Sequence, residues 1–86
     1  MAIDYNAEAY RLLEAVHDLA GGDPQTAVLS ARTGIPNTYL AFSSPSRYLK
    51  ELGLIRTTGT TGHGLVGMFL ITPTGIRLVE AHRATG

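Results

Sequence analysis

Apolar residues recur at steps of three and four between positions 6 and 20, a spacing that places them on one side of a helix. This stripe consists of Ala9, Leu12, Leu13, Val16, Leu19 and Ala20. Asn6 or Asp4 can cap the start of the helix, and the pair Gly21-Gly22 ends it. The pattern therefore predicts a first helix that buries one face in a core.

A second helix is predicted next, because Asp23 can cap its first turn and Pro24 suits its start. Its narrow inner face would consist of the small residues Ala27, Val28 and Ala31. Small side chains at such a face would let two helices approach each other closely.

A turn is predicted over residues 33–37, in which Gly34 permits a positive φ and Ile35 plugs the core beneath. Residues 38–42 either begin the third helix or form a separate short turn. Their large apolar members are expected in the core; these are Tyr39, Leu40 and Phe42.

Residues 43–53 predict a short helix with both ends marked. Ser44 or Ser43 caps the start, Pro45 takes the first helical position, and Gly53 stops the helix. Helical spacing predicts an inner side made of Tyr48, Leu49 and Leu52. The other residues form a polar, partly cationic outer face: Ser46, Arg47, Lys50 and Glu51.

A hairpin follows, with strands over residues 54–58 and 65–72 joined by a Thr/Gly-rich loop at 59–64. The returning strand is apolar on both faces, with Leu65, Phe69 and Ile71 opposite Val66, Met68 and Leu70. Either the last helix and the N-terminal arm cover both sides, or one face binds a second subunit or a neighbouring domain.

The last helix is predicted from the pair Thr72-Pro73, which repeats the cap-then-proline start. It extends over residues 75–83. Ile76 and Val79 are expected to point inward, with Leu78 as a further candidate.

The composition is typical of one folded domain spanning residues 1–86, because 44% of the residues are apolar and 16% are charged. The absence of cysteine excludes disulfides and cysteine-ligated zinc. The longest apolar run, residues 65–71, is far shorter than the roughly 20 residues of a membrane-spanning helix, and no signal sequence follows Met1. We therefore expect a soluble, cytoplasmic protein.

The net charge is zero, but its distribution is uneven. Residues 1–23 carry a balance of −4, whereas residues 24–72 carry +3 from Arg32, Arg47, Lys50 and Arg56 against Glu51. This asymmetry would allow one face of the domain to meet phosphate groups.

The sequence offers no convincing catalytic or metal-binding motif. Residues 62–67 match G-x-G-x-x-G, but they lead into a strand instead of the helix that a dinucleotide site requires. His17, His63 and His82 lack a paired metal spacing, and no serine occupies a nucleophile elbow. We expect no enzyme activity, no metal and no cofactor, with His17 and His82 at helix surfaces.

The order helix, helix, turn, helix, hairpin, helix resembles the winged helix-turn-helix family over nearly the whole chain. The resemblance is carried by Gly34-Ile35-Pro36, Leu49-x-x-Leu52-Gly53-Leu54-Ile55 and Leu70-Ile71-Thr72-Pro73-Thr74-Gly75. The last segment is similar to the strand-to-helix junction of small bacterial and archaeal regulators. The resemblance implies an α+β, mainly α fold with a three-helix core, a β-hairpin wing and a C-terminal helix.

The resemblance also implies sequence-specific binding of double-stranded DNA in transcription regulation. The helix starting near Ser44 would enter the major groove, and the wing, residues 56–66, would contact the backbone or the minor groove. Arg47 suits guanine because its planar fork bonds two acceptors, and Lys50 suits phosphate. The other expected DNA contacts are Ser46, Arg32, Arg56, Thr60, Thr61 and His63.

A protein-interaction or adaptor domain is the alternative function, because the wing tip carries threonines and His63 but no lysine or arginine. We expect a homodimer, with a different protein partner as the second hypothesis. The expected contact residues are Val66, Met68, Leu70 and Phe69.

Overall fold

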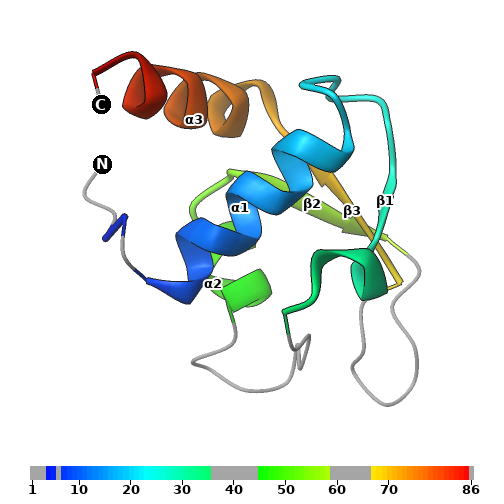
Figure 1. Ribbon diagram of the computed structural model, residues 1–86. Helices are drawn as coiled ribbons and strands as arrows, with labels where there is room; N and C mark the ends of the chain where they lie inside the picture. The colour runs from blue at the N-terminus through cyan, green and yellow to red at the C-terminus, as the bar shows by residue number, and fades with distance from the viewer. Residues whose placement is uncertain (1–3, 6, 36–44, 59–66, 86) are drawn as a thin grey trace.

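The computed structural model describes residues 4–5, 7–35, 45–58 and 67–85. Its elements in chain order are α1 (Glu8–Leu19), β1 (Val28–Leu29), the 3-10 helix η1 (Ser30–Thr33), α2 (Pro45–Glu51), β2 (Ile55–Thr58), β3 (Met68–Ile71) and α3 (Pro73–Thr85). The described part of the chain is an α+β arrangement of three α-helices and a three-stranded antiparallel sheet (Figure 1). The predicted α+β class is confirmed.

Helix α1 forms as predicted and supplies the centre of the core. Five residues of the predicted stripe are buried and the sixth, Leu19, is partly buried against them; the five are Ala9, Leu12, Leu13, Val16 and Ala20. Tyr10 is buried as well, which the pattern did not predict. Ala7 occupies the N-cap position without a side-chain hydrogen bond, so Asp4 is not the N-cap residue, and Asn6, the other predicted cap, lies outside the described residues.

The predicted second helix is wrong. The Asp23 carboxylate accepts hydrogen bonds from the Gln25 N–H (2.9 Å) and the Thr26 hydroxyl (2.8 Å), which forms a tight turn. The chain then enters β1, where Val28 pairs with Phe69 of β3. Of the predicted inner face only Val28 is buried, whereas Ala27 and Ala31 are exposed. The short η1 follows in place of a second α-helix.

The turn after η1 is confirmed at its first residues. Gly34 has a φ of 71°, which a side chain would disfavour, and Ile35 is partly buried against the core. Pro36 and Asn37 lie outside the described residues. The predictions for residues 38–42 and for the caps Ser43 and Ser44 lie outside them too.

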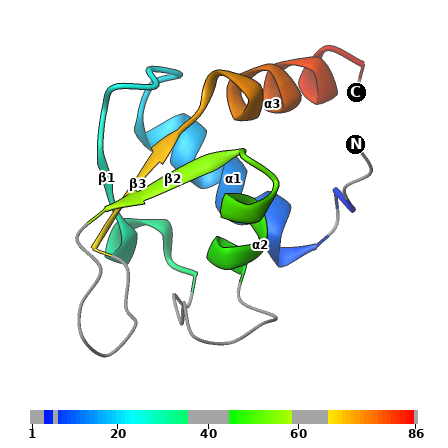
Figure 2. The same ribbon diagram turned by 180° about the vertical axis from the view of Figure 1, so that it is seen from behind.

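The sheet has the order β1-β3-β2, and the predicted hairpin pairing of β2 with β3 is confirmed. Seen from behind, β2 and β3 cross in front of α1, with α2 near the start of β2 (Figure 2). Alternation along β3 turns Phe69 and Ile71 into the core, where both are fully buried. Met68 and Leu70 therefore belong to the opposite, outer face.

The predicted start of α3 at Thr72 is confirmed and is also a tertiary junction. The Thr72 hydroxyl accepts the Gly75 N–H (3.1 Å) and donates to the Gly53 carbonyl (2.7 Å). The Thr72 N–H donates to the carbonyl of Leu54 (3.1 Å). Farther along α3, Val79 is buried and Ile76 and Leu78 are partly buried, as predicted. The junction thus ties α3 to the segment that follows α2.

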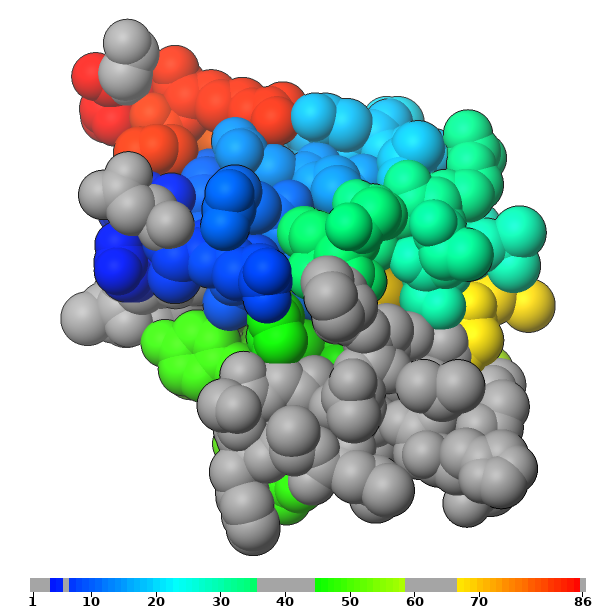
Figure 3. Space-filling view, turned by 60° about the horizontal axis from the view of Figure 1, so that its bottom comes forward, coloured from blue at the N-terminus to red at the C-terminus, as the bar shows by residue number. Residues whose placement is uncertain are grey.

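Charged residues join α1 to α3 where their surfaces adjoin (Figure 3). The Arg83 guanidinium donates to both carboxylate oxygens of Asp18 (2.8 and 3.0 Å) and to Glu14 (3.2 Å). The bonds from Arg83, together with the bond from His17, lower the pKa of Asp18 to about 2. Beside them, His82 stacks on Tyr5 with ring centroids 3.8 Å apart. This contact set positions α3 against the first helix.

Asp18→Asn should lower the free energy of unfolding at neutral pH by about 1 kcal/mol or less, since the pair is solvent-exposed. Because the pKa of Asp18 is lower in the folded state, the stabilisation is present above about pH 4 and disappears as the pH falls towards 2. Urea melts of both proteins from pH 7 to 2 measure this. The control is the same Asp18→Asn substitution in an Arg83→Gln background, where it should change the free energy of unfolding little because the ion pair is already absent. A loss of stability by Asp18→Asn that persists at pH 2 would contradict the assignment of the effect to this ion pair.

Gly75→Ala should destabilise the domain by about 1–3 kcal/mol, because an added Cβ would collide with the Leu54 carbonyl and crowd Ile71. The sign is unusual, since glycine-to-alanine changes inside helices ordinarily stabilise them by about 1 kcal/mol. Thermal or urea unfolding measures the change, with the exposed Ala81→Gly on the same helix as a control expected to cost about 1 kcal/mol. A stabilised Gly75→Ala protein would show that the junction is not closely packed.

Candidate nucleic-acid interface

Helix α2 presents the basic residues that the sequence singles out. Pro45 is its first residue, as predicted, and Leu49 is fully buried and anchors it to the core. The predicted stop is confirmed: Gly53 has a φ of 74°, and its N–H donates to the Lys50 carbonyl (3.0 Å). The Leu54 N–H closes the end by donating to the Leu49 carbonyl (3.0 Å). The helix therefore has a fixed orientation with respect to the core and β2.

Two side chains of α2 lie on the face opposite to the predicted one. Ser46 was expected on the outer face, but it is fully buried (0% exposed). Tyr48 was expected inside, but it is 38% exposed. Ser46 precedes Leu49 by three positions, so both occupy the inner side of the same turn, and the helix is rotated relative to the predicted stripe. Ser46 is therefore not available to DNA in this conformation, while Tyr48 is.

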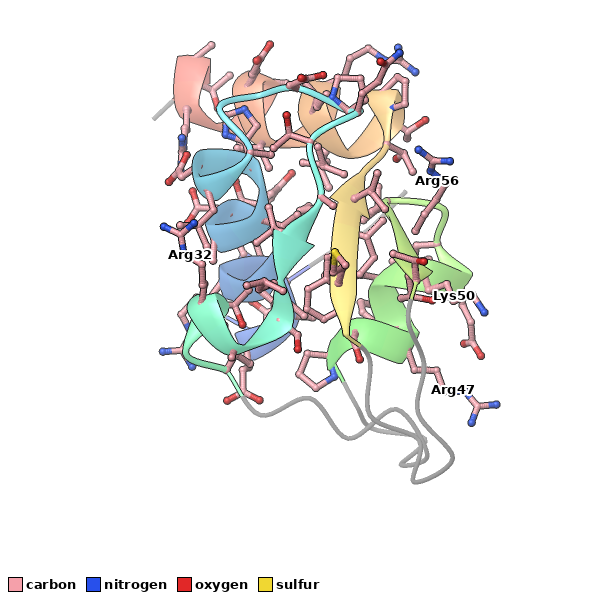
Figure 4. All side chains as sticks on the ribbon, turned by 90° about the vertical axis from the view of Figure 1, so that its right-hand side faces the viewer. Arg32, Arg47, Lys50 and Arg56 are labelled. Atoms are coloured by element: carbon pink, nitrogen blue, oxygen red, sulfur yellow. The ribbon has the colours of Figure 1, made fainter. Side chains whose placement is uncertain are left out.

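Arg47 and Lys50 project from the same side of α2 (Figure 4). Lys50 is exposed, whereas the Arg47 side chain is 31% exposed. The Arg47 Nε atom donates to Glu51 Oε1 at 3.2 Å, one turn along the helix. A carboxylate at the last residue of α2 thus lies beside Arg47 and opposes any approaching phosphate.

Arg56 extends this basic surface onto the sheet. It is exposed on β2, and Figure 4 shows it in line with Lys50 and Arg47 along one side of the molecule. We call these three residues the basic strip. Arg32, which is exposed on η1, lies at the opposite side of the molecule in the same view, beside α1. The structure therefore brings together three of the four basic residues of the central region.

The predicted wing contacts lie mainly outside the described residues, because Thr60, Thr61 and His63 fall within 59–66. Of the described wing residues, Thr58 is exposed at the end of β2 and Thr57 is partly buried. The G-x-G-x-x-G match ends at Gly67, which leads into strand β3 as expected and not into a helix. Residues 62–66 of that match lie outside the described residues.

The predicted partner contact is corrected at one position. Phe69 is fully buried in the core, so its assignment to a surface contact is wrong. Met68 is 37% exposed and Leu70 is partly buried on the outer face, and Val66 lies outside the described residues. Sequence reasoning missed Leu29, which pairs with Met68 and is 55% exposed. Leu29 was missed because the segment that contains it was predicted as a helix. Only the assignment of a strand there would have placed Leu29 beside Met68.

The histidines expected at helix surfaces lie between α1 and α3. The His17 side chain is only 13% exposed, with Nδ1 3.0 Å from Asp18 Oδ1 and Nε2 3.5 Å from Glu80 Oε2. Among the described residues there is no group of three or more potential metal ligands and no pocket. None of the helices that the structure describes has the length and apolar character needed to cross a membrane.

Comparisons of the chain with protein-family models, curated proteins and solved structures found no match.

Proposed function

We propose that the chain is a winged helix-turn-helix domain that binds double-stranded DNA and regulates transcription. The observation that supports this most directly is the basic strip, in which α2 and β2 direct Arg47, Lys50 and Arg56 to one side. The layout is compatible with such a domain, since a helix is followed directly by a hairpin whose inner face packs on the core. In this proposal α2 is the recognition helix and β2 begins the wing.

The three cations would have different roles at the DNA. Arg47 would bond a guanine edge through its planar guanidinium, which requires it to exchange its contact with Glu51 for the base. Lys50 and Arg56 would contact phosphates, where a point charge or a single bond suffices. Tyr48, exposed on the same helix, adds a hydroxyl that can bond a phosphate oxygen.

Binding by one subunit should be weak and sensitive to salt, because the strip can neutralise only a few phosphates. A cytoplasmic homodimer would place two strips on one duplex and double the number of neutralised phosphates, which is why we propose a dimer as the DNA-binding form. The threonine-rich wing would add hydroxyl contacts without adding positive charge.

A second candidate function is an adaptor domain that binds another protein. It is favoured by one specific observation, the exposed apolar residues on the outer face of the sheet, Leu29 and Met68. The two functions use different surfaces centred on different chemistry and can be tested separately.

Alanine substitutions in the basic strip test the DNA proposal. Arg47→Ala should reduce the binding free energy by about 1–3 kcal/mol on a site selected from random duplex, and the variant should discriminate less between sequences. Lys50→Ala should weaken binding to all sequences alike and reduce the slope of log K against log salt concentration by about one. Fluorescence anisotropy titrations at about 50 mM salt measure this. Arg32→Ala is the matched control, since Arg32 lies away from the strip. No binding by the wild-type protein at concentrations on the order of tens of micromolar would refute the proposal.

Glu51→Gln should strengthen binding to random duplex several-fold at low salt. The substitution removes a negative charge that lies beside Arg47 and ends its competition with DNA for that side chain. The same titration measures it, with Glu80→Gln on α3 as a charge-matched control that should have no effect. Unchanged or weaker binding by Glu51→Gln would show that α2 does not face the DNA.

A further inference from the structure

The outer face of the sheet carries a connected group of side chains. The strand register places Leu29, Met68 and Thr58 in one row across the three strands, and Leu70 and Arg56 in the next row. Directly paired residues on one face of a sheet lie about 5 Å apart, so these side chains are neighbours. We call these five residues the outer sheet face.

The apolar part of this face is exposed to a degree that the fold does not require. Leu29 is 55% and Met68 is 37% exposed, and both belong to the four large apolar side chains that are exposed among the described residues. Single exposed apolar residues are common, but adjacent ones at paired strand positions form a patch. Strand pairing would tolerate polar side chains here, because the outward positions contribute nothing to the core.

The one charged residue of the outer sheet face is a cation. Arg56 lies opposite Leu70 in the register, on the β2 side of the patch. None of the five residues of the face is acidic. A partner that offers apolar side chains for the centre and a carboxylate for Arg56 would therefore complement this face.

We infer that the outer sheet face binds a short segment of another protein in which apolar residues alternate with or border carboxylates. Met68 and Leu29 receive the apolar side chains, and Arg56 pairs with a carboxylate. The inference rests on the second candidate function and does not depend on DNA binding. It identifies the partner class of that surface as an acidic, apolar peptide.

A second copy of this chain fits the face less well. The same face of a second copy offers no carboxylate to pair with Arg56, because none of its five residues is acidic. An anionic membrane fits less well too, because Leu70 is partly buried and the exposed apolar side chains are few. Both occupants remain outcomes that the experiment distinguishes.

The test uses a short fluorescent peptide of leucine, aspartate and glycine, and a control peptide with lysine at every aspartate. In anisotropy titrations the acidic peptide should bind the wild-type chain and the lysine peptide should not. Met68→Asp should weaken binding about tenfold or more, since it places a negative charge in the apolar centre that also repels the aspartates of the peptide. Arg56→Glu should weaken it several-fold, and the effect should shrink at high salt.

Ala81→Asp, at an exposed position on α3, is the charge-matched control and should bind the acidic peptide like the wild type. Circular dichroism verifies that each variant is folded. Equal binding of the two peptides by the wild-type chain, or full binding of the acidic peptide by Met68→Asp, would overturn the inference. So would a chain that does not bind the peptide and instead sediments as a dimer that Met68→Asp dissociates, or adsorbs to vesicles of phosphatidylserine. DNA binding is measured in separate titrations, so its failure leaves the peptide result interpretable.

Discussion

The structure depends on the packing of the α1 stripe against the inner face of the sheet. Leu12, Leu13 and Val16 are fully or almost fully buried, and the strand residues Phe69 and Ile71 face the same core. Because side chains alternate along a strand, burying Phe69 and Ile71 fixes Met68 and Leu70 on the opposite face. A register shift by one residue would bury the outer set and expose the core set, which would cost several kcal/mol of lost burial. The core therefore determines both which residues are buried and which are presented to partners.

The elements predicted correctly are those in which one strong pattern met no competitor. The six-residue stripe of α1, the apolar strand β3 and the Thr72-Pro73 start of α3 each have a single interpretation. The segment after Asp23 has two interpretations, because an aspartate that can cap a helix can also close a turn. Its carboxylate binds the Gln25 N–H and the Thr26 hydroxyl, and the chain then extends until Val28 pairs with Phe69. Pairing with a strand some forty positions later leaves no local pattern, so β1 and the exposure of Leu29 could not be predicted from the segment alone.

The candidate site could be predicted only in part for a related reason. In a helix as short as α2, the inner face is defined by very few residues, and hydrophobicity favoured Tyr48 over Ser46. The structure buries Ser46 with Leu49 because a small side chain fits close to the core, and it leaves the larger Tyr48 at the surface. The positions of Arg47 and Lys50 were less sensitive to this rotation, since charged side chains remain outside in either case. The sequence could not separate Arg32 from the other three basic residues, because only the turn at Asp23 and strand β1 place η1 beside α1, away from the basic strip.

Two surfaces with different chemistry meet at Arg56, and this arrangement constrains how the domain can work. Arg56 belongs to the basic strip through its alignment with Lys50 and Arg47, and to the outer sheet face through its pairing with Leu70. One guanidinium cannot bond a phosphate and a partner carboxylate at full strength simultaneously, because both compete for the same few N–H donors. A strip with only three cations is affected strongly when one of them is occupied, since each phosphate contact carries a large share of the electrostatic affinity. If both proposed functions operate, an acidic partner on the sheet would therefore weaken the hold of α2 on DNA through a shared residue, without any change in the fold.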